Sequence, residues 1–147
     1  MSSDVDQIAA SRSRADAIYA RDLACQALGI RLDEVGPGRA RLRMWVASTM
    51  ANGHGIAHGG YLFLLADAAF AYACNTYGPV TVAHSAQVTF LRPAVVHDEL
   101  CADAVERARY GRNGIYDVTV RRADGEVVAE FRGQSTIVGG FQPAADD

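Results

Sequence analysis

Hydrophobic and polar positions along the chain predict one long apolar helix set among strands. The longest apolar stretch, residues 61–74, is interrupted by a single charge, Asp67. The glycine-rich loop 48–60 precedes this stretch, and Gly78-Pro79 follows it as a cap and a stop, so we expect a helix from about residue 60 to residue 77. A helix that is apolar almost all round must be covered on most of its sides.

Period-two alternation predicts strands on both sides of this helix. Residues 30–35 and 40–47 are two expected strands around the turn Gly36-Pro37-Gly38, with arginines on the outward face of the second. Four more strands are expected at 80–91, 99–109, 115–122 and 126–138, the last two joined through Asp124-Gly125. Short connections imply an antiparallel sheet and the α+β class. We expect a strongly curved antiparallel β-sheet wrapped around one long central helix. A partner subunit would also cover whatever part of the helix the sheet leaves exposed.

The length of 147 residues suits a single domain. We expect a helical N-terminal segment at 1–27, with its helix over about residues 4–27, and the main domain at 28–138. The last residues, 139–147, are expected to form a frayed C-terminal tail.

Composition and charge argue against several classes of function. The 14 basic and 17 acidic residues are spread along the chain without a basic stripe, so no nucleic-acid partner is expected. The first 22 residues carry charges throughout, unlike a signal peptide, and the longest apolar stretch is too short to span a bilayer, so no membrane association is expected. Cys25, Cys74 and Cys101 form no CxxC pair and indicate reduced thiols in a cytoplasmic protein.

Asp67 is the anomaly of the central helix. An ionised carboxylate is costly to bury, so it must face a cleft, find a partner or take up a proton. No basic residue lies within two turns on the same helix, which excludes local pairing. Two explanations remain: an ion pair with an arginine at a helix or subunit contact, and a catalytic role.

The loop before the helix offers a complement to this acid. Gly59 and Gly60 open the helix, where backbone N–H groups lack acceptors and the macrodipole adds partial positive charge, so this end can stabilise an oxyanion. A sharp turn into the helix is the alternative explanation for the glycines. His58 and Asn52 can hold the loop or hydrogen-bond a substrate carbonyl. His54 lies four residues before His58, but the intervening glycines and the lack of further ligands argue against zinc, and no metal site is expected.

The spacing between donor and acid predicts a shared site. Gly59 and Asp67 are eight residues apart, hence about 12 Å along one helix. Both must lie near one reacting carbon, which a single helix can hardly achieve. Two helices running antiparallel across a two-fold axis can place Gly59 of one subunit opposite Asp67 of the other. We therefore expect a homodimer with active sites shared between subunits.

Several motifs in the chain resemble a known family. The segment NGHGIAHGGYLFLLADAAFAYACNTYG, the later FLRPA, and GRNGIYDV followed by EFRG resemble the phenylacetate-degradation (PaaI-type) acyl-CoA thioesterases of the hotdog superfamily. The resemblance covers residues from about 23 to 138. It implies the hotdog fold, with a curved sheet around one helix, and dimers paired into a homotetramer.

The resemblance also implies a reaction and the roles of four residues. The reaction is hydrolysis of an acyl-CoA, with an aromatic acyl group of the phenylacetyl or hydroxyphenylacetyl kind, to the free acid and CoA. Asp67 matches the catalytic carboxylate, which acts as a general base or as a nucleophile that forms an anhydride. Gly59 matches the residue whose N–H polarises the thioester carbonyl, and His58 and Asn52 match polar loop residues that support it. No cofactor is implied, because coenzyme A is part of the substrate.

Further residues are candidates for contacts with the substrate. These candidates are Gly60, Tyr61, Asn75, Thr76, Arg112, Asn113 and Gly114. The last three lie in RYGRNGIYD, a loop one residue shorter than the usual family form, where the arginine is expected near a phosphate of CoA. A plain hairpin loop with a solvated arginine is the alternative. Leu62, Leu65 and Phe70 are candidates for the acyl pocket, although most apolar helix residues belong to the core.

Two other functions fit the same pattern. A hotdog dehydratase or hydratase also combines a histidine with a helix carboxylate, but it needs that histidine beside the acyl carbon. A non-catalytic acyl-CoA-binding protein would usually carry an added regulatory segment, and the first 25 residues are too short and too little basic for one. The order of HGG and Asp67 favours hydrolysis.

Overall fold

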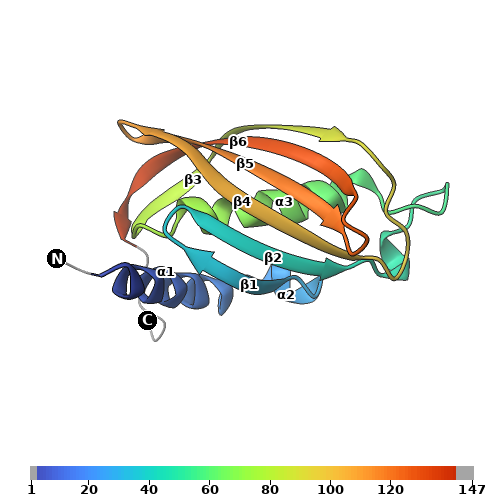
Figure 1. Cartoon of the computed structure of the whole chain (residues 1–147), viewed down its shortest axis with the longest axis horizontal. Helices are drawn as coiled ribbons and strands as arrows, with labels where there is room; N and C mark the ends of the chain where they lie inside the picture. The colour runs from blue at the N-terminus through green and yellow to red at the C-terminus, as the bar shows by residue number, and fades with distance from the viewer. Residues whose placement is uncertain (1–2, 142–147) are drawn as a thin grey trace.

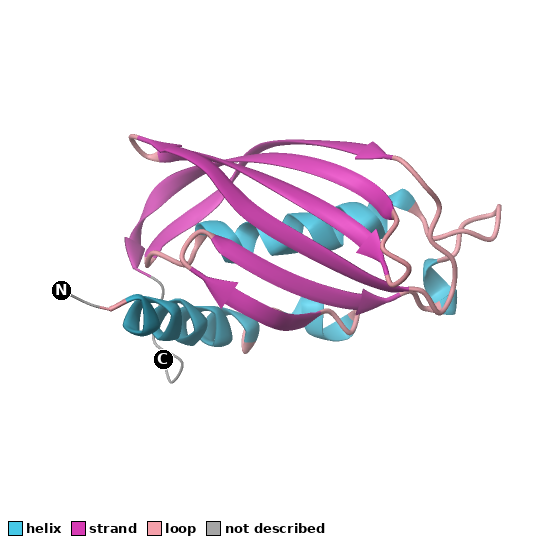
Figure 2. Cartoon of the chain, viewed as in Figure 1, coloured by secondary structure: helices cyan, strands magenta, loops and turns pink. Residues whose placement is uncertain are grey.

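One long helix lies in the concave face of a curved antiparallel sheet (Figures 1 and 2). The computed structural model describes residues 3–141. Its helices are α1 (Asp4–Tyr19), α2 (Leu23–Ala27), the short 3₁₀ helix η1 (Ser48–Met50) and α3 (Gly59–Cys74). Its strands are β1 (Arg31–Gly36), β2 (Arg39–Trp45), β3 (Pro79–Phe90), β4 (Glu99–Tyr110), β5 (Asn113–Arg122) and β6 (Val127–Phe141). The order across the sheet is β1-β2-β4-β5-β6-β3, and every adjacent pair is antiparallel. The expected α+β class and the wrapped helix are confirmed.

Three of the sequence-based boundaries are wrong. The single helix expected over 4–27 is two helices, because Asp22 accepts a hydrogen bond from the N–H of Cys25 (3.0 Å) and so caps α2. The central helix α3 ends three residues earlier than expected, at Cys74. The strand β6 continues to Phe141, so residues 139–141 are not a frayed tail, and 142–147 lie outside the described residues.

Gly133 of β6 allows the sheet to close around α3. A Cβ at this position would lie 2.8 Å from ring atoms of Phe70, which is fully buried on the helix. The Phe70 ring also packs against Tyr116 and Phe131, with ring centroids 5.7 and 5.8 Å away. The glycine of the EFRG segment therefore makes room for the fully buried ring of Phe70, and any side chain there would push β6 away from α3.

The two edges of the sheet differ. At the β1 edge, α1 packs alongside, and Arg12 donates a hydrogen bond to the carbonyl of Asp33 (3.0 Å). At the other edge, β3 pairs only with β6, and all residues from Val82 to Gln87 are exposed. A long edge strand without such cover is a template for pairing with another chain.

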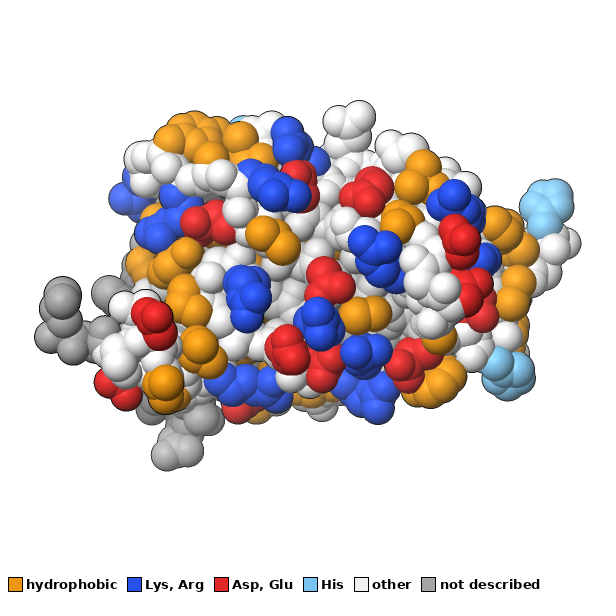
Figure 3. All heavy atoms as spheres, viewed as in Figure 1, with side chains coloured by type: hydrophobic (Ala, Val, Ile, Leu, Met, Phe, Trp, Pro, Cys, Tyr) orange, Lys and Arg blue, Asp and Glu red, His pale blue; other side chains and the backbone are white. Residues whose placement is uncertain are grey.

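The convex face of the sheet carries charges of both signs (Figure 3). Arg41 bonds Asp103 across β2 and β4 at 2.6 Å, and Asp117 of β5 lies between Arg107 and Arg132. These pairs confirm that the arginines of β2 point outward, and they make this face a solvated one. In the described part of the chain, no helix is long and apolar enough to cross a membrane.

Candidate active site

Asp67 lies on the one face of α3 that the sheet leaves open. Nine of the sixteen residues of this helix are buried, and Gly60, Leu64, Asp67 and Ala71 are among those that are half-buried or exposed. Their spacings of four, three and four residues place them on a single helix face. We call this row the open stripe. A ligand or a partner subunit can therefore reach Asp67 only through the open stripe.

The carboxylate of Asp67 has no partner within residues 3–141. No hydrogen bond or ion pair to it is found there, and burial raises the pKa of this carboxyl. Burial and, to a smaller extent, the charge of Asp67 raise the pKa of the thiols of Cys25 and Cys74, and these buried groups carry no positive charge. The structure therefore offers no arginine to pair with Asp67 inside the described chain. A half-buried acid with a raised pKa and no structural partner is typical of a group that handles protons.

The N-terminus of α3 presents two backbone N–H groups. His58 is the N-cap residue, with φ −61° and ψ 134°, and its side chain makes no capping hydrogen bond. The first bonded amide is that of Tyr61, which donates to the carbonyl of His58 (3.0 Å). The N–H groups of Gly59 and Gly60 have no acceptor in the part of the chain that the structure describes. Together with the macrodipole, these donors can hold an oxyanion.

Asn52 holds the loop that leads into α3. Its side-chain oxygen accepts hydrogen bonds from the backbone N–H of His54 (2.9 Å) and of Ile56 (3.3 Å), and its own backbone N–H donates to the carbonyl of Ile56 (2.7 Å). The loop is then anchored where the N–H of His58 donates to the carbonyl of Met50 (2.8 Å). The oxygen of Asn52 therefore serves the loop, and its Nδ2 amide is the part left for a ligand.

A groove of about 530 Å³ adjoins the N-terminus of α3. It is lined by Asn52, Ile56, Ala57, Gly59, Leu62, Phe90, Leu91, Arg92, Pro93 and Ala94. Of the four proposed catalytic residues, it brings together Asn52 and Gly59. The side chain of His58 is exposed and lies outside the lining, and Asp67 lies further along the helix. Half of the lining comes from residues 90–94, a segment that the sequence marked only as part of the family resemblance.

The candidates at the other end of α3 have structural partners. Asn75 donates to the carbonyl of Thr81 (2.9 Å) and accepts from its N–H (3.0 Å), and Thr76 accepts from the N–H of Gly38 (2.8 Å). Both side chains are buried and join the helix end to β3 and to the turn between β1 and β2. Their contact with a substrate stays a prediction, as does that of Tyr61, which is half-buried against the core.

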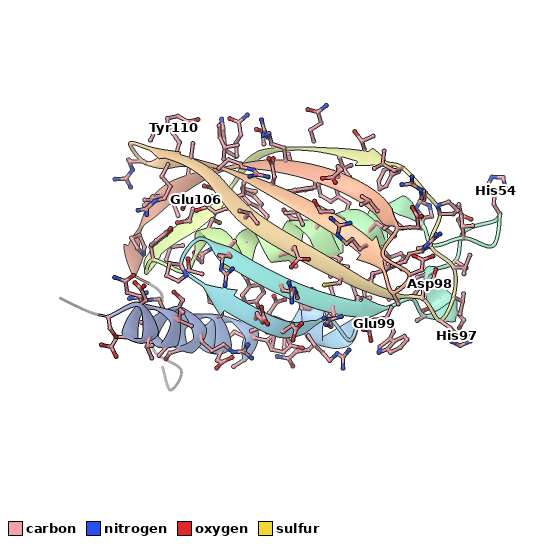
Figure 4. The ribbon with its side chains drawn as sticks, viewed as in Figure 1. His54, His97, Asp98, Glu99, Glu106 and Tyr110 are labelled. Atoms are coloured by element: carbon pink, nitrogen blue, oxygen red, sulfur yellow. The ribbon has the colours of Figure 1, made fainter. Side chains whose placement is uncertain are left out.

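The hairpin at residues 110–114 lies far from Asn52 in the same chain. Figure 4 shows Tyr110 at one end of the molecule and His54, at the tip of the loop before α3, at the other. The hairpin is a tight turn with Gly111 at φ +59°, and Arg112 donates from Nε and Nη2 to the carbonyl of Ile137 (3.3 and 3.1 Å). Arg112, Asn113 and Gly114 line a small cleft near Cys74, so they cannot reach a ligand on Gly59 of their own chain. Among residues 3–141, no cluster of three or more His, Cys, Asp or Glu could hold a metal ion.

Comparison with known proteins gives one consistent family. The family model described as the thioesterase superfamily matches residues 54–129. The chain is 43% identical over 126 residues to the acyl-coenzyme A thioesterase PaaI of Escherichia coli K12, covering 86% of this chain and 90% of that protein. The family model's match begins within the glycine-rich loop and includes all of α3.

Solved structures agree with the sequence comparison. The PaaI protein from the phenylacetic acid degradation operon of E. coli superposes with a TM-score of 0.90 at 40% identity, covering 91% of this chain and 97% of that one. An N33D mutant of the phenylacetic acid degradation protein PaaI from Thermus thermophilus has a TM-score of 0.77 at 38% identity, covering 80% of this chain and all of that one. The hotdog fold expected from the sequence is confirmed.

Proposed function

The chain belongs to the thioesterase superfamily and is a thioester hydrolase, and we propose that its substrate is an aromatic acyl-CoA of the phenylacetyl or hydroxyphenylacetyl kind. The products are then the free acid and CoA. The observation that supports thioester hydrolysis is the presence, on one helix, of an unpartnered carboxylate at Asp67 and of free amides at Gly59 and Gly60 within the described residues. The apolar groove beside Gly59 suits an aryl group, and the similar E. coli protein comes from a phenylacetic acid degradation operon.

The roles follow from where charge develops. The N–H of Gly59 donates to the thioester carbonyl oxygen and stabilises the oxyanion that forms when the carbonyl carbon is attacked. Asp67 takes a proton from the attacking water as a general base, or attacks the carbon itself and gives an anhydride that water then opens. The CoA thiol leaves readily as a thiolate, so the site needs no strong acid. Asn52 keeps the loop and the donor in place through its two hydrogen bonds.

Hydrolysis fits this geometry better than hydration of a double bond. A dehydratase or hydratase needs a histidine beside the acyl carbon, whereas the side chain of His58 is exposed and lies outside the groove. In our proposal, His58 supports the loop at the entrance to the site.

We further propose that the active unit is a homodimer, and that two dimers pair into a tetramer. Within one chain, Gly59 and Asp67 are about 12 Å apart along α3, too far to act on one carbon. A two-fold axis between two open stripes brings Gly59 of one subunit to Asp67 of the other. The uncovered edge of β3 supports a strand pairing that would hold the two subunits in that arrangement.

The same dimer gives the hairpin of residues 110–114 a role. Antiparallel packing carries the partner's hairpin to the end of the molecule where Gly59 lies. Arg112 and Asn113 of one subunit would then contact the CoA whose thioester rests on the other subunit, with Arg112 near a phosphate. The reaction needs no cofactor beyond the CoA of its substrate. The three free cysteines suit a cytoplasmic location.

Release of free thiol from a panel of aromatic, short-chain and long-chain acyl-CoAs tests this function. Asp67→Asn is expected to lower kcat by at least about a hundredfold, the scale of a positioned general base. Asp16→Asn, in the C-terminal half of α1 and ion-paired to Arg12, is the matched control and should keep full activity. Full activity in the Asp67 variant would contradict the catalytic assignment, and equal turnover of all acyl chains would contradict the aromatic preference.

A further inference from the structure

Phe90 occupies an unusual position in the sheet. Pairing across the sheet places it in one row with Ala129, Val120, Ala102 and Leu42, all on the concave face. Those four residues are completely buried, whereas 52% of Phe90 is exposed. A phenyl ring that shares a row with four core residues but stays half exposed is available to a ligand.

The ring of Phe90 lies beside the donor amide. A Cβ on Gly59 would stand 2.9 Å from Cζ of Phe90 and 3.2 and 3.3 Å from its Cε atoms, so the tip of the ring touches the start of α3. Phe90 also lines the groove, together with Leu62 and Leu91. The aromatic ring and the N–H of Gly59 therefore belong to the same concave surface.

Apart from the N–H of Gly59 and the Nδ2 amide of Asn52, the side-chain polar groups of the groove are already occupied. The side-chain oxygen of Asn52 binds loop amides, and Arg92 donates to the carbonyl of Val127 (2.9 Å) and pairs with Glu126 (3.1 Å). The rest of the lining that an acyl group can contact is mostly apolar, and Phe90 is the aromatic side chain in it. A volume of about 530 Å³ accommodates an arylacetyl group with room to spare.

We propose that Phe90 is the specificity-determining residue of this hydrolase and forms the wall against which the ring of an arylacetyl group packs. The proposal rests on the function proposed above. With the thioester oxygen on the N–H of Gly59, the centre of an arylacetyl ring lies about 4 Å from the carbonyl carbon, because only one methylene separates them. Two rings held this way meet within the 4.5–7 Å range of aromatic pairs. A straight acyl chain gains only dispersion contacts with Phe90.

The experiment compares kcat/KM for phenylacetyl-CoA and for hexanoyl-CoA in the wild type, Phe90→Leu and Phe90→Tyr. An aromatic pair favours the aryl substrate by a factor of about 2 to 10, so Phe90→Leu should lower the ratio by that factor through phenylacetyl-CoA alone. Phe90→Tyr keeps the ring and should keep the ratio. Trp45→Leu is the control, because Trp45 is also 52% exposed but lies outside the groove.

Light scattering and thermal melting separate this role from a purely structural one. If the leucine variant is poorly folded, Phe90→Met gives a second measurement of the kcat/KM ratio, because methionine keeps most of the side-chain volume without the ring. A ratio unchanged in the leucine and methionine variants, or lowered equally in Trp45→Leu, overturns the proposal. A wild type that shows no preference for phenylacetyl-CoA also overturns the role of Phe90. That result contradicts the proposed aromatic substrate itself, and it is distinguished from a failure of Phe90 alone because it appears without any mutation.

Discussion

The tip of the Phe90 ring rests on Gly59, and a methyl group on that glycine would lie 2.9 Å from Cζ of Phe90. The contact joins the last residue of the edge strand β3 to the first residue of α3. The N–H of Gly59 is the proposed oxyanion donor. The end of β3 and the start of α3 must therefore keep their relative positions for this donor to stay in place. The neighbouring Gly60 has open space around its Cβ position.

The two adjacent glycines are therefore expected to respond oppositely to alanine. Gly59→Ala forces the Phe90 ring or the helix start to move and should lower stability by about 1–3 kcal/mol, with a loss of activity. Gly60→Ala meets nothing within its own chain and should raise the stability of a dissociated subunit by about 0.5–1 kcal/mol, because alanine restricts the unfolded chain. Denaturant unfolding of both variants checks the pair. Equal effects of the two substitutions would contradict the contact, and a smaller effect of Gly59→Ala in a Phe90→Ala background would support it.

Asp67 is expected to oppose folding at neutral pH. Burial raises the pKa of its carboxyl in the folded state, so the protonated form favours folding. That contribution is complete below the unfolded-state pKa of about 3.9 and is lost as the pH rises through the folded-state pKa. Asp67→Asn, which stays neutral, should therefore be more stable than the wild type at pH 7.

Thermal unfolding between pH 4 and 8 measures this effect. The advantage of Asp67→Asn should shrink as the pH falls toward 4, because the wild-type carboxyl then becomes protonated too. Asp16→Asn, on the exposed face of α1, should show no such gain. An Asp67 variant that is less stable than the wild type at pH 7 would indicate a stabilising partner for the carboxylate.

The uncovered edge of β3 is expected to hold the dimer. Val82→Lys puts a charge on this edge and should shift the protein toward monomers, with activity falling by about tenfold or more. Val105→Lys is the control, since Val105 is 41% exposed against 42% for Val82 but lies on the convex face of an interior strand. Light scattering and thiol release check both variants. A monomer that keeps wild-type activity would exclude shared sites.

Mixed dimers test the shared site directly. A subunit with Asp67→Asn still offers Gly59, and a subunit with Gly59→Ala still offers Asp67, so a heterodimer has one intact site of two. Random mixing makes about half of the dimers heterodimers, and about a quarter of wild-type activity is therefore expected from two nearly inactive parents. Activity no higher than that of the parents would place both groups in one chain.

Local patterns in the sequence were enough to predict the helix α3, the antiparallel strands and the unusual acid. Apolar periodicity, the glycines before α3 and the Asp-Gly turn before β6 depend on neighbours in the chain, and these features appear as expected. The sequence also pointed to Gly59 and Asn52, which line one groove. It missed the break between α1 and α2, where the side chain of Asp22 competes with continuation of the helix.

Other parts of the site depend on contacts between distant segments. Phe90 reaches Gly59 only because the pairing of β3 with β6 sets its row and because Gly133 lets the sheet bend around Phe70. Nothing near Phe90 in the sequence carries that information.

The sequence by itself determined which groups can do chemistry, namely an acid without a local partner and free amides at a helix start. The tertiary structure decided which of them meet. It gave Asn75 and Thr76 backbone partners, put the hairpin of Arg112 at the end of the molecule opposite Asn52, and left the stripe of Asp67 open. The physical reason is that residue type and spacing set local conformation, whereas sheet register and curvature set which side chains share a surface.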